Sequence, residues 1–243
     1  MTRPAARAGT DAPPLPEAAA LAADLDRDGY TVIRRWLTPE ACDRLRATVM
    51  DPDRLLPEGG DQRTGQYWRD AQFTPGARLR EALYTGLVPH AQRWLDALGT
   101  GATLPPTLAG FEARCRDAGL GAPLSSLSRL RSGDEAALQH RADDALAFPL
   151  QASVMLSRAG RDYTGGEFVM TEQRPRMQSR PAAFLLDQGD LVLFASGTRP
   201  FRGAQGAYRV NLRHGVSVVR TGERCALDLV FHAARDAAAT QDR

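Results

Sequence analysis

The sequence predicts a mainly β fold with N-terminal helices, in which the strands form a double-stranded β-helix, a cupin-like jelly roll. Two observations support this class. Helical spacing of apolar residues dominates up to about residue 120, and short apolar runs separated by Gly, Asp and Pro dominate after Leu124. We expect a tail at 1–14, rich in Ala, Pro and Arg, to be disordered. We expect one domain at 15–243, with a helical layer at 15–120 and a jelly-roll core at 124–233.

The N-terminal elements follow from periodicity and helix-start signals. Apolar spacing predicts a helix at 15–28, and Tyr30-Thr31-Val32-Ile33 is typical of a short strand. Thr38-Pro39-Glu40 offers an N-cap, a proline at the first helical position and an acidic first turn, so a helix is expected from there to residue 49. Further helices are predicted at 77–83, 88–98 and 107–118, and a loop-rich segment at 51–76.

The C-terminal half carries short strands at close and regular spacing, which is the pattern of a sandwich or barrel. The predicted strands are 150–156, 167–170, 183–186, 191–194, 209–212, 216–219 and 225–231. No internal repeat and no second domain are indicated.

The composition indicates a cellular compartment and limits the classes of binding partner. The three cysteines are odd in number and widely spaced, which favours a reducing cytoplasm over a disulfide framework. No apolar run approaches 18 residues and no charged-then-apolar leader is present, so the sequence predicts neither secretion nor a membrane span. The net charge of +2 gives no bulk electrostatic argument for binding duplex DNA or membranes.

Arginine is unusually prominent, because the chain has no lysine and all 31 cationic side chains are Arg. Between residues 158 and 224 arginines clearly outnumber acidic residues. Arg suits bidentate binding of phosphate or carboxylate. The alternative explanation is a GC-rich genome, whose codon usage favours Arg over Lys at every position.

Histidine is scarce, which limits the candidates for a metal site to four residues. His90 lies in a helical stretch, where a packing or surface role is expected, and His232 ends the last predicted strand. His140 and His214 remain as candidate metal ligands, at positions that a jelly roll brings together at the open end of its barrel. Non-haem Fe(II) sites use two His and one carboxylate. Arg224, ten residues after His214 on the next predicted strand, can clamp a carboxylate bidentately.

The chain resembles a known family over nearly its whole length, and four stretches carry this resemblance. They are Phe148-Pro149-Leu150-Gln151, Tyr163-Thr164-Gly165-Gly166-Glu167-Phe168, residues 171–180 (TEQRPRMQSR) and residues 208–217 (YRVNLRHGVS). They are similar to bacterial Fe(II)/2-oxoglutarate oxygenases that act on damaged nucleic-acid bases. The resemblance implies that His214 is the distal iron ligand and Arg224 the clamp for 2-oxoglutarate, and that the cofactors include Fe(II), 2-oxoglutarate and O₂.

The chain departs from that family at the proximal motif, where His-Gln-Asp is expected. Aligning His140 with the family histidine places Ala142 at the carboxylate position, although the register can shift by one residue. Three alternatives are open. Ala142 leaves a coordination position vacant for chloride; Asp143 or Asp144 supplies the carboxylate and the protein hydroxylates; or iron is lost and a nucleotide-binding sensor remains.

The first alternative is the sequence-based expectation. Chloride can supply the negative charge that Asp would add, and this chain resembles the nucleotide chlorinases of nucleoside-antibiotic pathways. That resemblance implies chlorination of the 2′ carbon of deoxyadenosine monophosphate. We expect a small nucleotide and no polymeric nucleic acid, while the oligomeric state stays open. The expected substrate-binding residues are Arg174, Arg176, Arg180, Arg199, Arg202 and Arg213, with Tyr67, Trp68 and Phe73 as stacking candidates.

Overall fold

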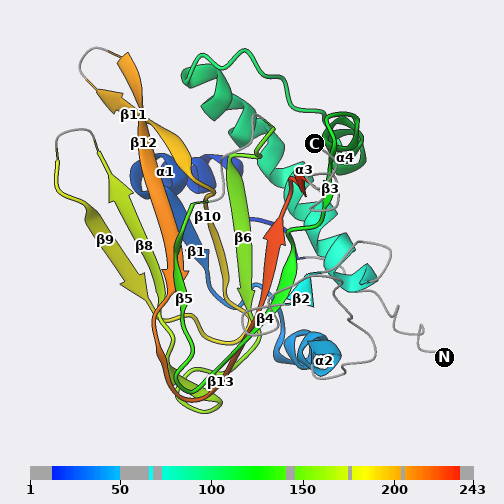
Figure 1. The fold of residues 1–243 in the computed structure, drawn as a ribbon, viewed down its shortest axis with the longest axis vertical. Coiled ribbons are helices and arrows are strands. Elements are labelled where there is room, and N and C mark those ends of the chain that lie inside the picture. The colour runs from blue at the N-terminus through cyan, green and yellow to red at the C-terminus, as the bar shows by residue number, and fades with distance from the viewer. Residues whose placement is uncertain are drawn as a thin grey trace, which may run out of the picture.

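Two antiparallel sheets lie face to face in the computed structural model of the chain, and helices lie beside them (Figure 1). The structure describes residues 13–49, 66–67, 73–140, 146–174, 177–203 and 206–235. This arrangement is a double-stranded β-helix with N-terminal helices, so the predicted fold class is confirmed. Residues 1–12 of the predicted tail lie outside the described residues.

The major sheet has the strand order β1-β10-β6-β13-β4-β2, and β7 also pairs with β13. Its strands are β1 (Tyr30–Ile33), β2 (Gln66–Tyr67), β4 (Ser126–Arg131), β6 (Leu150–Met155), β7 (Tyr163–Gly165), β10 (Leu191–Ala195) and β13 (Val219–Val230). The predicted strand at 30–33 is therefore confirmed, and it pairs with β10 although the two are far apart in sequence.

The minor sheet has the order β11-β12-β8-β9, and β5 pairs with the end of β12. Its strands are β5 (Ala136–Gln139), β8 (Phe168–Gln173), β9 (Arg180–Phe184), β11 (Thr198–Gly203) and β12 (Gly206–Val216). A small separate pair joins β3 (Leu120–Ala122) to β14 (Ala234–Arg235).

Strand boundaries differ from the prediction where the chain turns between sheets. The strand predicted at 216–219 is instead the end of β12, a connection through Ser217 and Val218, and the start of β13. Strands β4 and β5 were not predicted, because serine and arginine interrupt the apolar pattern of β4 and alanine dominates β5. Ser126, Ser128 and Leu130 of β4 and all four residues of β5 line a cavity, so the usual apolar signal of a core strand is missing.

Four helices accompany the sheets: α1 (Ala18–Asp28), α2 (Pro39–Val49), α3 (Thr74–Ala97) and α4 (Leu108–Asp117). The two helices predicted at 77–83 and 88–98 are one helix, α3, and Pro89 lies inside it. The apolar face on both sides of Pro89, from Leu79 to Trp94, is buried, and this packing holds the helix together. Among the described residues no helix is long and apolar enough to cross a membrane.

Helix α3 is fastened to the end of β13 on the side of the major sheet away from the minor sheet (Figure 1). The Arg80 guanidinium donates hydrogen bonds to the carbonyls of Val230 and Phe231, both at 2.8 Å. Glu112 of α4 forms an ion pair with the same guanidinium. The C-terminal end of β13 is thereby held by charge-assisted hydrogen bonds as well as by its strand partners.

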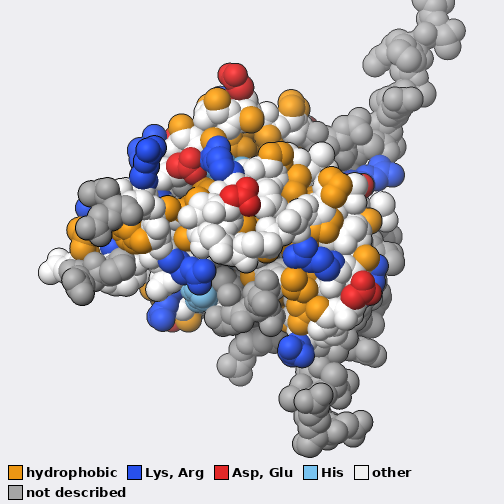
Figure 2. Space-filling model, turned by 90° about the horizontal axis from the view of Figure 1, so that it is seen from above, with side chains coloured by type: hydrophobic (Ala, Val, Ile, Leu, Met, Phe, Trp, Pro, Cys, Tyr) orange, Lys and Arg blue, Asp and Glu red, His pale blue; other side chains and the backbone are white. Residues whose placement is uncertain are grey.

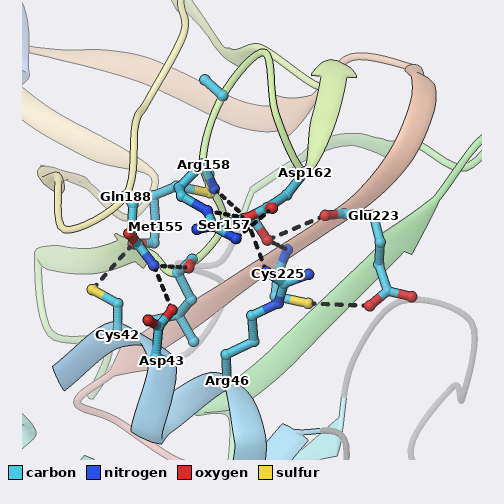
Figure 3. A network of polar contacts seen from close by, with 12 residues as sticks. Cys42, Asp43, Arg46, Met155, Ser157, Arg158, Asp162, Gln188, Glu223 and Cys225 are labelled. Carbon is cyan, nitrogen blue, oxygen red and sulfur yellow. Dashed lines mark hydrogen bonds and ion pairs between the residues drawn. The ribbon is translucent and has the colours of Figure 1, made fainter. Parts of the chain in front are cut away.

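Helix α2 is held to the major sheet by a polar network (Figure 3). Asp162 accepts hydrogen bonds from Nε and Nη2 of Arg158 at 3.0 and 2.9 Å, and from Arg46 of α2 at 2.9 Å. Arg158 is the main reason that the pKa of Asp162 falls to about 2. The Asp162 carbonyl also accepts the backbone N–H of Glu223, at 2.8 Å, so the network holds β13 immediately beside Arg224.

Candidate active site

A cavity of about 460 Å³ lies between the two sheets. Apolar side chains of Phe168, Phe194 and Val216 form part of its wall. Polar residues from both sheets also line it: Ser126, Ser128, Gln139, Gln151, Ser153, His214, Arg224 and Asp228. A cavity of this size, mainly apolar with a few convergent polar groups, is typical of a small-molecule site.

Arg224 faces this cavity from β13 and is only 2% exposed. Its Nε donates to the carbonyl of Gly166 at 3.1 Å, whereas Nη2 has no hydrogen-bond partner among the described residues. Burial lowers the pKa of Arg224, and the charge of Asp228 is the largest opposing influence. A buried cation with an unused N–H is unstable without an anion, so the site is built to receive one.

Gly166 allows Arg224 to take this position. Its backbone φ is +64°, a region that favours glycine, and a Cβ added there would lie 3.0 Å from Cδ of Arg224. Gly166 therefore also supplies the carbonyl that orients the guanidinium.

Asp228 lies four residues beyond Arg224 on the same face of β13. Ser153 of β6 donates a hydrogen bond to its Oδ1 at 2.6 Å. Gln151, two residues before Ser153, is 2% exposed, and its Nε2 has no hydrogen-bond partner among the described side chains and backbone. The cavity therefore offers an anionic acceptor and an unused donor at the end opposite Arg224.

His214 faces the same cavity from β12 and is 7% exposed. Its ring centroid lies 4.6 Å from that of Phe194 and 6.2 Å from that of Phe168. Gln139 of β5 is its cross-strand partner, and His140 follows directly. Gly215 permits this approach, because a Cβ there would lie 2.5 Å from the carbonyl oxygen of Ala136. The structure thus brings the backbone of His140 next to the strand position of His214.

The described residues do not by themselves form a three-residue metal site. Within them, no three His, Cys, Asp or Glu residues lie close enough together to hold a metal ion. Asp228 therefore does not complete a three-residue site with His140 and His214. Ala142, Asp143 and Asp144 lie at 141–145, outside the described residues. The His214 imidazole and the unused N–H of Arg224 in this cavity, with His140 directly after Gln139, fit Fe(II) with 2-oxoglutarate.

The other two histidines have packing roles. His90 is 7% exposed and its ring lies 4.9 Å from that of Trp94. His232 is 4% exposed, and its Nδ1 accepts a hydrogen bond from the backbone N–H of Phe148 at 3.3 Å. The expected packing role of His90 agrees with this burial.

Three of the expected substrate-binding arginines, Arg174, Arg180 and Arg202, line a second cavity of about 590 Å³. Met170 of β8 and Leu212 of β12 also line this second cavity. They lie two residues from Phe168 and His214, respectively, which line the first cavity, so each pair shares the inward face of its strand. The two cavities therefore follow one another along the inner face of the minor sheet.

Arg199 has a structural role, contrary to expectation. It is fully buried, its Nε and Nη2 donate to Glu172 at 3.0 and 2.5 Å, and it also bonds the carbonyls of Asp26 and Arg27. Its guanidinium is therefore already occupied. Arg213 is exposed and alternates with the inward-facing His214, so it points away from the cavities.

Phe73 is also a correction, because it is 3% exposed and belongs to the hydrophobic core, where no base can stack on it. Tyr67 lies in β2 and pairs with Ser126, whose side chain lines the first cavity. Trp68, Arg176 and the side chain of Tyr67 lie outside the described residues.

Asp228, Gln151, Ser153 and Ser126 were missed by sequence reasoning. One signal was present: polar residues alternate with apolar ones in Ser126-Leu127-Ser128 and Gln151-Ala152-Ser153, within otherwise buried strands. A period of two places the polar set on one face of a strand. Only the sheet order shows that this face lines a cavity.

Comparison with known proteins agrees with this geometry. A family described as "Oxygenase, catalysing oxidative methylation of damaged DNA" matches residues 64–234. Two uncharacterised proteins of Mycobacterium tuberculosis, from strains CDC 1551 / Oshkosh and ATCC 25618 / H37Rv, are 41% identical over 155 residues, which cover 64% of this chain. The match spans 66% of each relative, slightly less than two thirds of its length.

Solved structures share the fold at low sequence identity. A prolyl-4-hydroxylase of Pseudomonas putida is 16% identical with a TM-score of 0.50, over 93% of this chain and 98% of that chain. A prolyl hydroxylase of Trichoplax adhaerens, in complex with a hypoxia inducible factor peptide fragment, is 11% identical with a TM-score of 0.53, over 87% and 86%. The family model covers more than half of the chain, and the chain therefore belongs to the matched oxygenase family.

Proposed function

We propose that this protein hydroxylates a nucleotide or nucleic-acid base with Fe(II), 2-oxoglutarate and O₂. The observation that carries the proposal is the buried Arg224, whose unused Nη2 faces the same cavity as His214. When bound, the iron supplies the oxidant that removes a hydrogen from a substrate carbon, while 2-oxoglutarate is converted to succinate and CO₂.

Each residue has a defined part in this proposal. Arg224 binds the distal carboxylate of 2-oxoglutarate, which gives its buried guanidinium a counter-charge and its unused Nη2 a hydrogen-bond partner. His140 and His214 hold the iron. Asp143 or Asp144, which follow His140 closely in sequence, would supply the carboxylate of a hydroxylase.

The substrate class is supported by the family description, which names damaged DNA. A small nucleotide fits the surface better than a long polymer does. The net charge is +2, and the face seen in Figure 2 carries its arginines scattered among acidic and apolar side chains, without a continuous basic stripe. We propose that a base enters the first cavity while Arg180 and Arg202 in the second receive a phosphate.

The test is a turnover assay with product mass. The protein is loaded anaerobically with Fe(II), supplied with 2-oxoglutarate, chloride and a panel of nucleotides, and then exposed to O₂. Substrate-dependent succinate and a product heavier by one oxygen support the proposal. Tight iron binding with no succinate from any nucleotide contradicts the substrate class, and failure to bind iron favours the nucleotide-binding sensor.

A second candidate is chlorination, and the observation that favours it is Ala142 two residues after His140. If Ala142 occupies the carboxylate position, chloride can take that place on the iron, and the 2′ carbon of deoxyadenosine monophosphate is the candidate target. The same assay distinguishes the two reactions, since a chlorinated product shows the isotope pair and disappears when chloride is omitted. Ala142→Asp should then replace chlorine by oxygen in the product.

A further inference from the structure

We propose that Asp228 and Gln151 together recognise the hydrogen-bonding edge of an amino-bearing base, adenine or cytosine. Asp228 would be the residue that determines specificity. This inference rests on the proposed function, because it assigns the substrate end of the same cavity. It concerns residues that neither bind the distal carboxylate of 2-oxoglutarate nor form part of the histidine pair.

The two side chains are neighbours by strand register. Asp228 is the cross-strand partner of Ser153, and Gln151 is the partner of Val230, two residues after Asp228. Asp228 and Gln151 are thus diagonal neighbours on one face, where Cα atoms lie about 7–8 Å apart. Arg224 lies four residues away along β13, roughly 13 Å, which leaves room for 2-oxoglutarate between them.

The chemistry of the pair is complementary. Asp228 is an acceptor when ionised, and the described residues give it one hydrogen bond, from Ser153 to Oδ1. Gln151 has a buried Nε2 with no partner in the described part of the chain. Buried polar groups in such a state are stabilised by a ligand that supplies the missing partners. The matching ligand carries a donor beside an acceptor.

Thymine and hypoxanthine present that pattern with a single ring N–H beside a carbonyl oxygen, whereas adenine and cytosine present it with an amino group that carries two N–H donors. In adenine and cytosine this exocyclic amino group would donate to Asp228, next to a ring nitrogen that would accept from Gln151. Ser126, the cross-strand partner of Asp228 on β4, also lines the cavity and could accept the second N–H. Enzymes that act on bases commonly read this edge with hydrogen bonds and hold the ring against aromatic side chains. Phe194, the cross-strand partner of Gln151, lines the cavity at this position and supplies an apolar wall.

Binding to the metal-free protein tests the inference independently of turnover. Isothermal titration calorimetry would compare deoxyadenosine and deoxycytidine monophosphates with deoxyinosine and thymidine monophosphates, which lack the amino group. The wild type should bind at least one amino-bearing nucleotide ten times more tightly than both others. Asp228→Asn should lose that preference, and Gln151→Met should weaken all binding to amino-bearing nucleotides about tenfold. Equal binding of all four by the wild type overturns the inference.

A matched control and a second readout separate this role from a structural one. Asp96 is an exposed residue of α3 that does not line the cavity, so Asp96→Asn should keep the wild-type preference. In the turnover assay Asp228→Asn should raise KM for the amino-bearing nucleotide more than KM for the nucleotides that lack the amino group. Unchanged preference in both Asp228→Asn and Gln151→Met contradicts the inference but leaves the oxygenase function standing. Absence of succinate in the wild type counts against the proposed function instead.

Discussion

Arg224 and Asp228 face one cavity from the same strand, four residues apart, and no hydrogen bond joins them in the described part of the chain. Their opposite charges influence each other at a distance, since Asp228 opposes the lowering of the Arg224 pKa by burial. Separation of an ion pair in this way leaves space between the charges. We expect a ligand with its own charge and polar groups to fill it.

Arg224→Met should weaken the use of 2-oxoglutarate. A charge-assisted hydrogen bond contributes about 1.5–3 kcal/mol, so KM for 2-oxoglutarate should rise roughly 10- to 100-fold. Steady-state succinate formation measures this. The control is 2-oxobutyrate, which lacks the distal carboxylate: any weak turnover with it should be equal in wild type and variant, and a parallel loss would show that Arg224 does not bind that carboxylate.

The same substitution should not destabilise the protein without ligands. Arg224 is a buried charge with an unused N–H, and replacing such a charge by an apolar side chain of similar length is often neutral or stabilising. Thermal unfolding of the metal-free protein should give an unchanged or higher Tm for Arg224→Met. A clearly lower Tm would mean that the contacts of Arg224 within the protein, such as the hydrogen bond to the Gly166 carbonyl, outweigh the cost of burying its charge.

His214→Ala should reduce the affinity for Fe(II). Loss of a direct ligand should cost more than the 10- to 100-fold typical of residues that only orient ligands, so a loss of at least about 100-fold is expected. Anaerobic equilibrium dialysis measures it. His90→Gln is the matched control, because His90 is buried against Trp94 and should not affect iron binding. Equal affinity in His214→Ala and wild type would remove His214 from the metal site.

Glu172→Gln should destabilise the fold strongly. The fully buried Arg199 would keep its backbone contacts but lose its counter-charge, which typically costs about 3–5 kcal/mol. For a chain of this length that corresponds to a fall in Tm of roughly 6–20 °C. The exposed Glu81→Gln serves as the control and should lie within about 0.5 kcal/mol of wild type. A similar Tm in both variants would contradict the structural role of Arg199.

Stability should depend on pH through His90. Burial, and then the charge of Arg93 at 2.9 Å from Nδ1, lower the pKa of His90 from 6.5 to about 4. The folded protein therefore binds this proton less readily than the unfolded chain does. The stabilisation is complete above pH 6.5 and is lost as the pH falls toward 4. Urea unfolding between these values should show a smaller pH dependence for His90→Gln than for wild type, and identical slopes would exclude His90.

The sequence by itself determined the fold class, the short list of histidines and the position of Arg224. Strand periodicity and turn residues are local, so they could be recognised without contacts between distant segments. The first helices were also predictable, although Pro89 suggested a break that the continuous buried face of α3 prevents.

Tertiary structure decided the chemical environment of each polar side chain. Arg199 resembles the other arginines in sequence, but Glu172 and the end of α1 enclose it, whereas Arg180 and Arg202 remain at a cavity. Asp228 and Gln151 face a cavity only because β13 pairs with β6 in one particular register, and a shift by one residue would turn them to the opposite face. Burial and partners depend on segments far apart in the chain, and for this reason local patterns cannot specify them.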